Sequence, residues 1–294
     1  MSTRKHARLS SQLELGRLLR HWRDVRGKSQ MALSLDTGIS QRHLSFIESG
    51  RSAPSRQTLL YIAEALDVPF RDRNEWLMAG GFAPSYKENR WNAEEMSSVA
   101  HALDRMLRQH EPFPAIVMDR YWNIVMRNGA APRFFNRFID LDARPEPRNM
   151  LHLMFDPAGM RPFIVNWKDA SKALIQRIQR EAVGHTMDAR TQELIASLLA
   201  YPDHDPGFPS QQTDDPSPTL PMVPLSFEKD GQVLRYFSMV TTVGTPQAIA
   251  TQELRIESMF PADDATEAAH HRLMEQTGNM AKVAPGKRPN PSLG

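Results

Sequence analysis

The chain has 294 residues, of which 40% are hydrophobic and 24% charged, so it is long enough for two folded domains of ordinary size. It contains no cysteine, which excludes disulfide frameworks, thiolate metal sites, iron–sulfur clusters and cysteine nucleophiles and fits a cytoplasmic protein. The net charge is only +2, but residues 1–60 carry 11 Lys and Arg against 4 Asp and Glu, so a basic head precedes a mildly acidic body.

A basic head fits either nucleic acid or a membrane surface, and charge alone does not separate the two. No run of about 18 apolar residues could span a membrane. The first residues, MSTRKHARLSSQ, lack the apolar stretch of a secretory signal. We therefore expect a cytoplasmic protein with no membrane partner.

Residues 10–81 have the pattern of a compact all-α domain, in which short amphipathic stretches alternate with capping residues. Serines before these stretches and glycines after them are the residues preferred at the two ends of helices. Five helices are expected: one ending at Gly27, one between Ser29 and Gly38, one between Ser40 and Gly50, one opening at Pro54-Ser55 and one over residues 71–78.

Residues 82–92 are polar and contain a proline, which predicts a linker. The body then mixes helices with strands. An amphipathic helix is expected over residues 96–109, a strand, turn and strand in PAIVMDRYWNIVMRN, and helices near 130–138, 148–155, 167–180 and 190–199.

Residues 202–224 hold seven prolines and are expected to form a long loop. Two strands, LSFEK and VLRYFSMVTTV, meet at Asp230-Gly231, which is a strong hairpin signal. Residues 265–294 are expected to be a flexible tail.

The segment SQMALSLDTGISQRHLSFIESG, residues 29–50, carries the most specific signal in the chain. A helix-turn-helix needs two short helices at a fixed angle, and Gly38 suits a turn position with positive φ. Ile39, Leu44 and Ile47 would then face inward. The opposite side of the third helix, free to contact DNA, carries Gln41, Arg42, Ser45 and Ser49.

Residues 15–68 closely resemble the lambda-repressor/Cro-type helix-turn-helix of the xenobiotic-response-element family. The positions in register include Ser29-Gln30, Leu33-Ser34, Gly38-Ile39-Ser40, Ile47-Glu48-Ser49-Gly50-Arg51 and Pro54-Ser55. The resemblance implies a DNA-binding domain whose third helix enters the major groove, with two subunits on a near-palindromic operator. It also implies a structural pair between Arg23 and Glu48. A helical bundle without a DNA role is the alternative.

Side-chain chemistry and the resemblance together give the candidates their roles on DNA. Gln30 and Ser40 lie at helix N-termini, where side chains and backbone N–H groups can hold phosphates. Gln41 and Arg42 are the expected base readers, because Gln pairs with adenine edges and Arg with guanine edges.

The remaining candidates on this face have weaker or shared roles. Ser45 is a second-rank base reader, and His43 is a phosphate or solvent contact. Arg51 and Arg56 resemble clamps on the DNA backbone. Phe46 either packs on a thymine methyl or covers the loop of residues 51–54.

Three stretches of the body resemble the MmyB-like ligand-binding transcription regulators: HEPFPAIVMDRYWNIVMRNGAA, NMLHLMFDPAGMRPFIVNW and FSMVTTVGTPQAIATQELRIESMFPAD. The resemblance implies a PAS-like α/β sensor domain over residues 93–264. The expected fold class is therefore α+β, a five-helix lambda-repressor-like domain followed by this sensor. A hydrophobic cavity is implied, with a fatty acid or similar acyl compound bound non-covalently and no other cofactor.

Candidate walls of that cavity are the large apolar residues Phe134, Phe135, Leu151, Met154, Phe155, Trp167, Leu174, Phe237 and Met239. Phe237 and Met239 share one face of a strand, because side chains alternate along it. Taken singly, a large apolar residue of this kind is more often ordinary core than a cavity wall. The candidate donors to a carboxylate head group are Arg161, His152, Asn166 and Arg235.

Two other functions compete with ligand sensing. Catalysis finds no support, because G-x-S-x-G, G-x-x-x-x-G-K-[ST], H-E-x-x-H and G-x-G-x-x-G are all absent. Four residues could be grouped as metal ligands: His204, Asp205, His270 and His271. Nothing in the sequence holds their two segments in place relative to each other, so no metal site is expected. The second rival is a regulator whose body serves dimerisation or a protein partner without a small ligand. We predict a homodimeric, non-enzymatic regulator that senses a small hydrophobic ligand.

Overall fold

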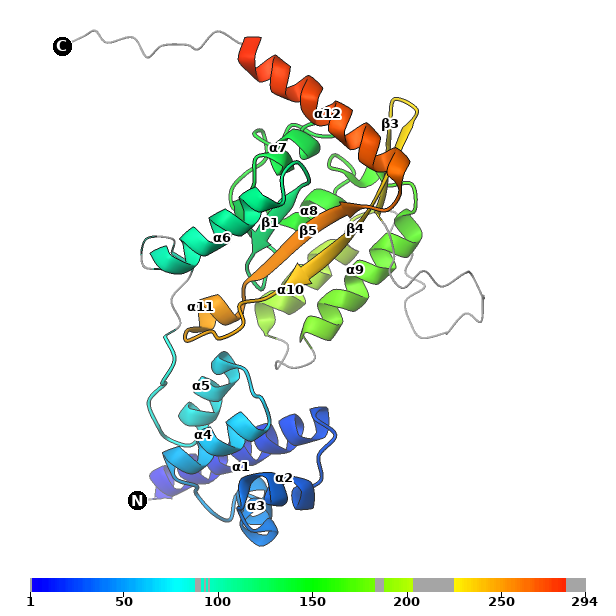
Figure 1. The fold of residues 1–294 in the computed structure, drawn as a ribbon. Coiled ribbons are helices and arrows are strands. Elements are labelled where there is room, and N and C mark those ends of the chain that lie inside the picture. Colours follow the sequence, from blue (N-terminus) through cyan, green and yellow to red (C-terminus); the bar gives the residue numbers. More distant parts are fainter. Residues whose placement is uncertain are drawn as a thin grey trace, which may run out of the picture. The chain divides into compact units, whose positions relative to one another are not determined.

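The computed structural model describes residues 2–87, 91–92, 94, 96–182, 188–202 and 225–283. The chain divides into two units. The first contains residues 1–92, 175–193 and 243–253, and the second contains residues 93–174, 194–242 and 254–294. Each unit is described by itself below, and Figure 1 labels the elements of both.

Five helices build most of the first unit, as predicted. They are α1 (Ser2–Val25), α2 (Gln30–Thr37), α3 (Gln41–Glu48), α4 (Arg56–Ala65) and α5 (Phe70–Ala79), drawn in blue to cyan in Figure 1. Their core is apolar, with Leu19, Leu33, Leu44 and Ile62 all fully buried.

The predicted capping residues begin and end the short helices. The side-chain oxygens of Ser29, Ser40 and Ser55 accept hydrogen bonds from backbone N–H groups three residues further on. Gly38 has φ +67° and ends α2 in the left-handed conformation that glycine adopts without strain. Local chemistry therefore sets the turn between α2 and α3.

Residues at the start of the predicted linker are bound to α5. The Tyr86 ring stacks on Phe70 with the ring centroids 4.2 Å apart. The buried Asn74 accepts a hydrogen bond from Ser85 N and donates one to Tyr86 O. The linker prediction is wrong for this stretch, because the Asn74 hydrogen bonds and the Phe70 ring hold it against α5.

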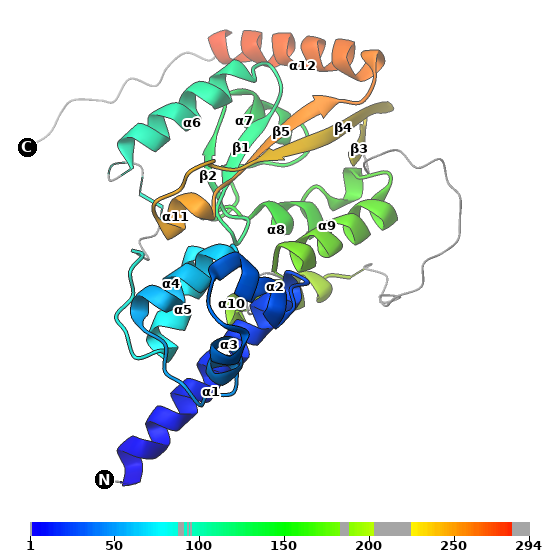
Figure 2. The ribbon, with the colours of Figure 1, turned by 60° about the horizontal axis from the view of Figure 1, so that its bottom comes forward.

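A five-stranded antiparallel sheet organises the second unit, with the strand order β2-β1-β5-β4-β3 among the described residues. Figure 2 shows the sheet with the helices around it. The strands are β1 (Ala115–Met118), β2 (Ile124–Arg127), β3 (Leu225–Lys229), β4 (Gln232–Thr241) and β5 (Arg255–Pro261). The central strand, β5, was not predicted from the sequence.

The predicted hairpin between β3 and β4 is confirmed. Asp230 and Gly231 both have positive φ, at 55° and 73°, and they connect the paired residues Lys229 and Gln232. Positive φ at both central residues is the geometry of a tight type I′ turn, whose twist matches that of the strands.

The remaining helices lie before, between or after these strands in the chain, and their parts within residues 175–193 and 243–253 belong to the first unit. They are α6 (Ser97–Gln109), α7 (Ala130–Phe135), α8 (Met150–Phe155), the short η1 (Arg161–Phe163), α9 (Trp167–Ala182), α10 (Ala189–Leu199), α11 (Ile249–Gln252) and α12 (Asp264–Val283). The elements α6 and α7 contact β1, and α12 contacts β4, β5 and α7.

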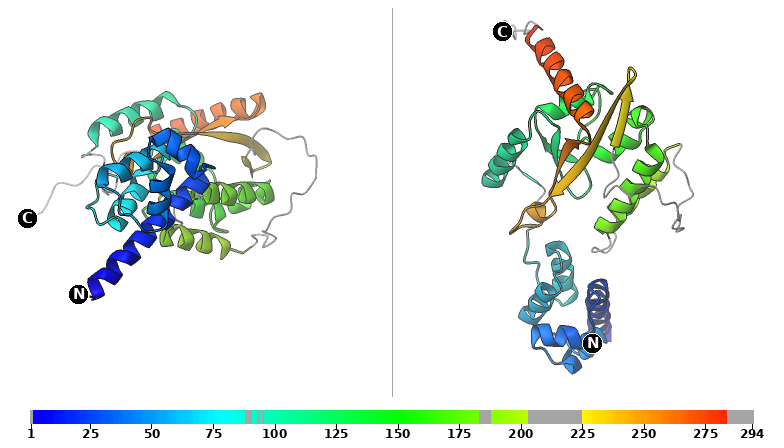
Figure 3. Two further views of the ribbon diagram at one scale, coloured as in Figure 1. Left: turned by 90° about the horizontal axis from the view of Figure 1, so that it is seen from below. Right: turned by 45° about the vertical axis from the view of Figure 1, so that its right-hand side comes forward.

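The expected tail from residue 265 onward is wrong as far as Val283. This stretch is the helix α12, drawn in orange to red in Figure 3. Ala269, Leu273 and Met274 are buried, so an apolar stripe holds the helix in place. The predicted loop over residues 202–224 lies outside the described residues except for Pro202. No helix of the described chain combines the length and apolarity needed to cross a membrane.

Candidate nucleic-acid interface and apolar cavity

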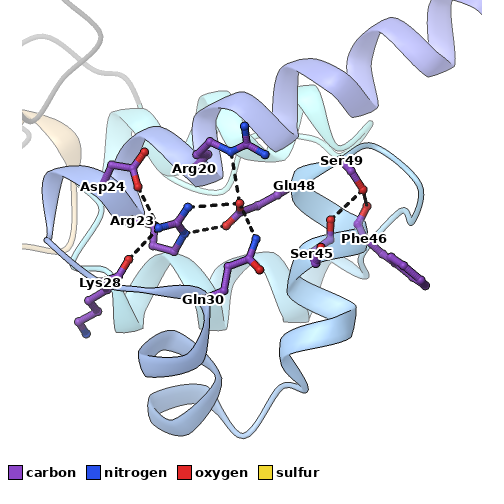
Figure 4. A network of polar contacts seen from close by, with 9 residues as sticks. All are labelled: Arg20, Arg23, Asp24, Lys28, Gln30, Ser45, Phe46, Glu48 and Ser49. Carbon is purple, nitrogen blue, oxygen red and sulfur yellow. Dashed lines mark hydrogen bonds and ion pairs between the residues drawn. The ribbon is translucent and has the colours of Figure 1, made fainter.

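A buried carboxylate, Glu48, ties together α1, α2 and α3 (Figure 4). Its side chain is 1% exposed. Arg23 Nε donates to Glu48 Oε1 at 2.8 Å, and Gln30 Nε2 donates to Glu48 Oε2 at 2.9 Å. Arg20 Nε approaches the same oxygen at 3.4 Å. The predicted Arg23–Glu48 pair is thus confirmed, and it belongs to a larger network.

Two opposing effects act on the pKa of Glu48. Burial is the largest single influence and raises it, but the hydrogen bonds from Arg23, Gln30 and Arg20, with the charge of Arg23, together outweigh burial. The pKa of Glu48 therefore lies below its ordinary value, and the carboxylate stays ionised at neutral pH.

The first helix approaches α3 closely beside this network. A Cβ atom added to Gly16 would lie 2.3 Å from the backbone oxygen of Glu48. No real Cβ comes that close to a backbone atom, so only glycine fits here. Gly16 therefore lets α1 reach the end of α3 at which Arg23 holds Glu48.

The structure gives Gln30 a different contact from the predicted one. Its amide nitrogen is bonded to Glu48, as Figure 4 shows, although the resemblance assigned this side chain to a phosphate. The hydrogen bond instead joins the N-terminus of α2 to the C-terminal end of α3. Ser40 is exposed, and its hydroxyl caps α3.

The predicted base readers lie on the solvent side of α3. Gln41 and Arg42 are exposed, whereas His43 and Ser45 are half-buried. Leu44 and Ile47, on the other side of the helix, are fully buried in the core. The helix therefore has one apolar and one polar face, as its sequence predicts.

Phe46 lies between two arginines of this surface. The guanidinium carbon of Arg42 is 5.3 Å from the ring centroid, and that of Arg51 is 5.1 Å away. The backbone N–H groups of Arg51 and Ser52 both donate to Phe46 O. Of the two interpretations of Phe46, this geometry favours the one in which it covers the following loop. Arg56 is exposed and donates to the hydroxyl of Ser85.

An apolar cavity of about 20 Å³ lies in the second unit, between the sheet and α7. Its volume is sized for a single water molecule. The apolar lining includes Ile116, Phe135, Met150, Phe227 and Met259. Its polar lining residues are Tyr236 and Ser238 of β4 and Glu257 of β5.

The structure brings only two of the predicted wall residues to this cavity, Phe135 and Phe237. Phe134 lies behind the lining, with its ring edge-to-face against Tyr236. Met239 is 55% exposed, and the structure places it outside the cavity. Leu151, Met154, Phe155 and Trp167 are buried and Leu174 is half-buried, all away from the lining.

The four candidate head-group donors also lie away from the cavity lining. Arg161 stacks on Trp167, with 4.6 Å between guanidinium carbon and ring centroid. His152 Nδ1 is 3.0 Å from the Tyr201 hydroxyl. Asn166 Oδ1 accepts from Ser226 N, and Arg235 is half-exposed and pairs with Asp263.

Sequence reasoning missed the polar residues of the cavity. Tyr236 and Ser238 alternate along β4, and this period-two pattern could have placed them on one face. Glu257 and Met259 lie on β5, which the sequence analysis did not recognise as a strand. The missing signal was therefore the central strand itself.

Tyr236 connects the cavity lining to a buried histidine of α12. The Tyr236 hydroxyl lies 2.7 Å from His270 Nδ1, and His270 Nε2 lies 2.8 Å from Pro112 O. A carbonyl oxygen can only accept, so Nε2 carries the proton and the hydroxyl donates to Nδ1. Burial lowers the pKa of His270 and raises the pKa of Tyr236, which keeps both groups neutral.

Metal binding finds no support in the described residues, where no three potential ligands form a group. Of the four residues that could be drawn as a metal set, His270 is engaged by Tyr236 and Pro112. His204 and Asp205 lie outside the described residues.

Two family models match the chain. One, described as "MmyB-like transcription regulator ligand binding domain", matches residues 99–273 and covers more than half of the chain. The other, described as "Helix-turn-helix domain", matches residues 14–76. No curated protein matches the chain.

We predict that Glu48→Ala lowers the free energy of unfolding of the first unit by about 3 kcal/mol, because Arg23 would lose its buried partner. Amide hydrogen exchange in α1, α2 and α3 measures this loss. Asp36→Ala is the control, because it removes a surface pair with Lys28 and should cost about 0.5 kcal/mol. Equal losses in the two variants would contradict the prediction.

A second prediction concerns acid. Because the folded chain holds His270 neutral, the unfolded chain binds more protons once the pH falls below about 6.5. The free energy of unfolding should therefore fall with pH there, by up to about 1.4 kcal/mol per pH unit from this group. Denaturant titrations at several pH values measure this dependence. In His270→Gln the free energy of unfolding should fall less steeply as the pH is lowered. The exposed His101→Gln controls for the loss of one histidine, and an unchanged slope in His270→Gln would refute the assignment.

Proposed function

The chain belongs to the family of MmyB-like transcription regulators, and we propose that it works as a homodimer on a near-palindromic DNA operator under the control of a small hydrophobic ligand. A helix-turn-helix domain and a ligand-binding domain on one chain make it a ligand-responsive transcription regulator. Both matching family models describe domains of transcription regulators, which supports a function without catalysis. A DNA partner also supports the expected cytoplasmic location.

The observation that carries the DNA proposal is the exposed polar face of α3. Gln41 and Arg42 project from a helix whose far end is fixed by the buried Glu48 network. Rigid placement matters, because a base reader must meet donor and acceptor groups at set positions in the major groove. Arg51, stacked on the same Phe46 ring as Arg42, supports a backbone contact beside the reading face.

For the ligand we propose an acyl compound, of which a fatty acid is the simplest example, in a PAS-like domain. An antiparallel sheet with helices packed on it supports this domain type. The largely apolar lining of the cavity supports an alkyl chain as the occupant. A cavity of about 20 Å³ has to widen before such a chain fits, so binding would displace side chains of β4, β5 or α7.

The segment that joins β4 to β5 supplies a route from ligand to DNA. Residues 243–253 belong to the first unit, where Arg71 of α5 pairs with Glu253 through two contacts of 2.8 and 3.1 Å. Gln252 also accepts from the backbone N–H of Phe70 at the start of α5. Strands that line the cavity are thus linked through this segment to the helix-turn-helix domain.

The proposed mechanism is a shift between two arrangements of the dimer. A ligand that binds one arrangement more tightly shifts the dimer toward it and so changes the spacing of the two α3 helices. The free energy of this shift is at most the difference between the ligand's binding free energies for the two arrangements. A difference of about 1–3 kcal/mol would change operator affinity roughly 5–150-fold. Saturating ligand without any change in operator affinity would contradict this coupling.

One rival function draws on the exposed part of β4. Met239 is 55% and Val240 is 39% exposed, on a strand that pairs with β3 and β5. These apolar side chains favour a body used for contact with a second subunit or a protein partner, without any small ligand.

Native and denaturing mass spectrometry of the full chain separate the two functions. A stoichiometric acyl compound released on denaturation would support ligand sensing. A protein that is pure and empty, and whose native mass is unchanged by added long-chain acyl compounds, would favour the rival. The native mass also tests the homodimer directly.

We predict that Arg42→Ala weakens binding to an operator selected from random DNA by about 1–3 kcal/mol and relaxes the preference at one base position. Arg51→Ala should weaken binding to all sequences alike and reduce the salt dependence. Titrations on selected and random DNA at several salt concentrations measure both effects. Arg17→Ala, at a side chain 82% exposed on α1, is the control. Equal losses on both DNAs for Arg42→Ala would mean that α3 does not read bases.

A further inference from the structure

Two buried hydrogen-bond donors flank the connection from η1 to α9. Arg161 Nε belongs to η1, and Trp167 Nε1 belongs to the first residue of α9. Both nitrogens are shielded from solvent, and neither has a hydrogen-bond partner among the described residues. Trp167 as a whole is only 8% exposed. Because an unpaired buried donor costs the free energy of its desolvation, this pair of donors points to an acceptor from outside the described chain.

The two donors lie at one place in the fold. The guanidinium carbon of Arg161 is 4.6 Å from the centroid of the Trp167 ring, so the cation is stacked on the indole. Phe155, at the end of α8, packs edge-to-face against the same indole, with the ring centroids 4.7 Å apart. An acceptor that reaches both donors would therefore bind among aromatic side chains.

The charge of Arg161 has no protein counter-ion in the part of the chain that the structure describes. Arg148 also has a buried nitrogen without a partner, but its guanidinium pairs with Glu146 at 2.6 Å. Asp156, in the connection from α8 to η1, pairs with Arg144 at 2.6 Å and not with Arg161. A half-buried cation without an acidic partner favours an anionic ligand.

The chemistry of the two donors indicates which anion fits. A guanidinium is planar and presents parallel N–H groups, a geometry that matches the two oxygens of a carboxylate. One cation offsets one negative charge, so a carboxylate suits this place better than a doubly charged phosphate. The aromatic surroundings favour a carboxylate that carries an apolar chain.

The edge of the sheet connects this place to the apolar cavity. Ile164, which follows η1, forms an isolated β-bridge with Phe227 of β3, and Phe227 lines the cavity. Phe163 of η1 packs on the Phe138 ring, which also contacts Phe227. A molecule bound at Arg161 could therefore reach the cavity along these aromatic side chains.

Building on the proposed ligand-sensing function, we propose that Arg161 and Trp167 bind the carboxylate of the acyl ligand. Arg161 supplies the charge and Trp167 Nε1 an additional hydrogen bond. Because this carboxylate subsite lies outside the cavity lining, the alkyl chain extends from it past Phe227 into the widened cavity.

The test compares two probes of equal chain length, decanoate and decanol, on the full-length protein by titration calorimetry. At about pH 7.5 decanoate is ionised and decanol is neutral. Arg161→Gln should weaken decanoate binding about tenfold, because a charge-assisted hydrogen bond is lost, and should change decanol binding less than about twofold. Unchanged decanol binding also shows that the variant keeps its fold.

A second variant tests the indole nitrogen, and a third is the control. Trp167→Phe keeps an aromatic ring and removes the Nε1 donor, so decanoate binding should weaken about threefold while decanol binding is unchanged. Arg235→Gln removes an arginine of the same unit that is already paired with Asp263, so the affinity for both probes should stay the same.

The other outcomes separate this proposal from the function on which it rests. Equal losses for both probes in Arg161→Gln would give Arg161 a structural role and overturn the subsite. Unchanged decanoate binding in Arg161→Gln would also overturn the subsite, while leaving ligand sensing in place. If neither probe binds the unaltered protein, the proposed acyl ligand fails, and the subsite fails with it.

Discussion

The helix-turn-helix domain depends on one buried negative charge. Glu48 ends α3, and Arg23 of α1 and Gln30 of α2 donate to its carboxylate, so three helices share one acceptor. The desolvation cost of a buried carboxylate is offset only when its hydrogen bonds are this complete. The same constraint fixes Gly16, where a side chain would push α1 off the carboxylate. The buried Glu48 network at the end of α3 therefore positions the side chains that α3 exposes to solvent.

The sheet of the second unit follows a similar logic with weaker forces. Its central strand, β5, pairs with β1 on one side and β4 on the other. Two of its side chains, Glu257 and Met259, line the cavity. The strand is central and yet carries Glu257. A polar residue in that position costs free energy unless a partner satisfies it.

Local chemistry made the helix caps of the first unit and the β3–β4 hairpin of the second unit predictable. Ser29, Gly38 and the Asp230-Gly231 turn act within a few residues of sequence, so their effect can be read without the fold. The β5 strand could not be recognised, because RIESMFP alternates only weakly and its strand form depends on partners far along the chain. Partners far along the chain also explain why α12 was predicted as a tail and why Met239 was predicted in the cavity. In both cases the outcome depended on which surface the helix or strand would face in the fold.

The pair between Arg71 and Glu253 has a consequence for how such proteins diversify. These residues are 182 positions apart, yet they belong to one unit. A gene rearrangement that exchanged only the first 92 residues would replace Arg71, the residue that pairs with Glu253. A change at either residue removes this ion pair, so α5 and the segment between β4 and β5 constrain each other's sequence.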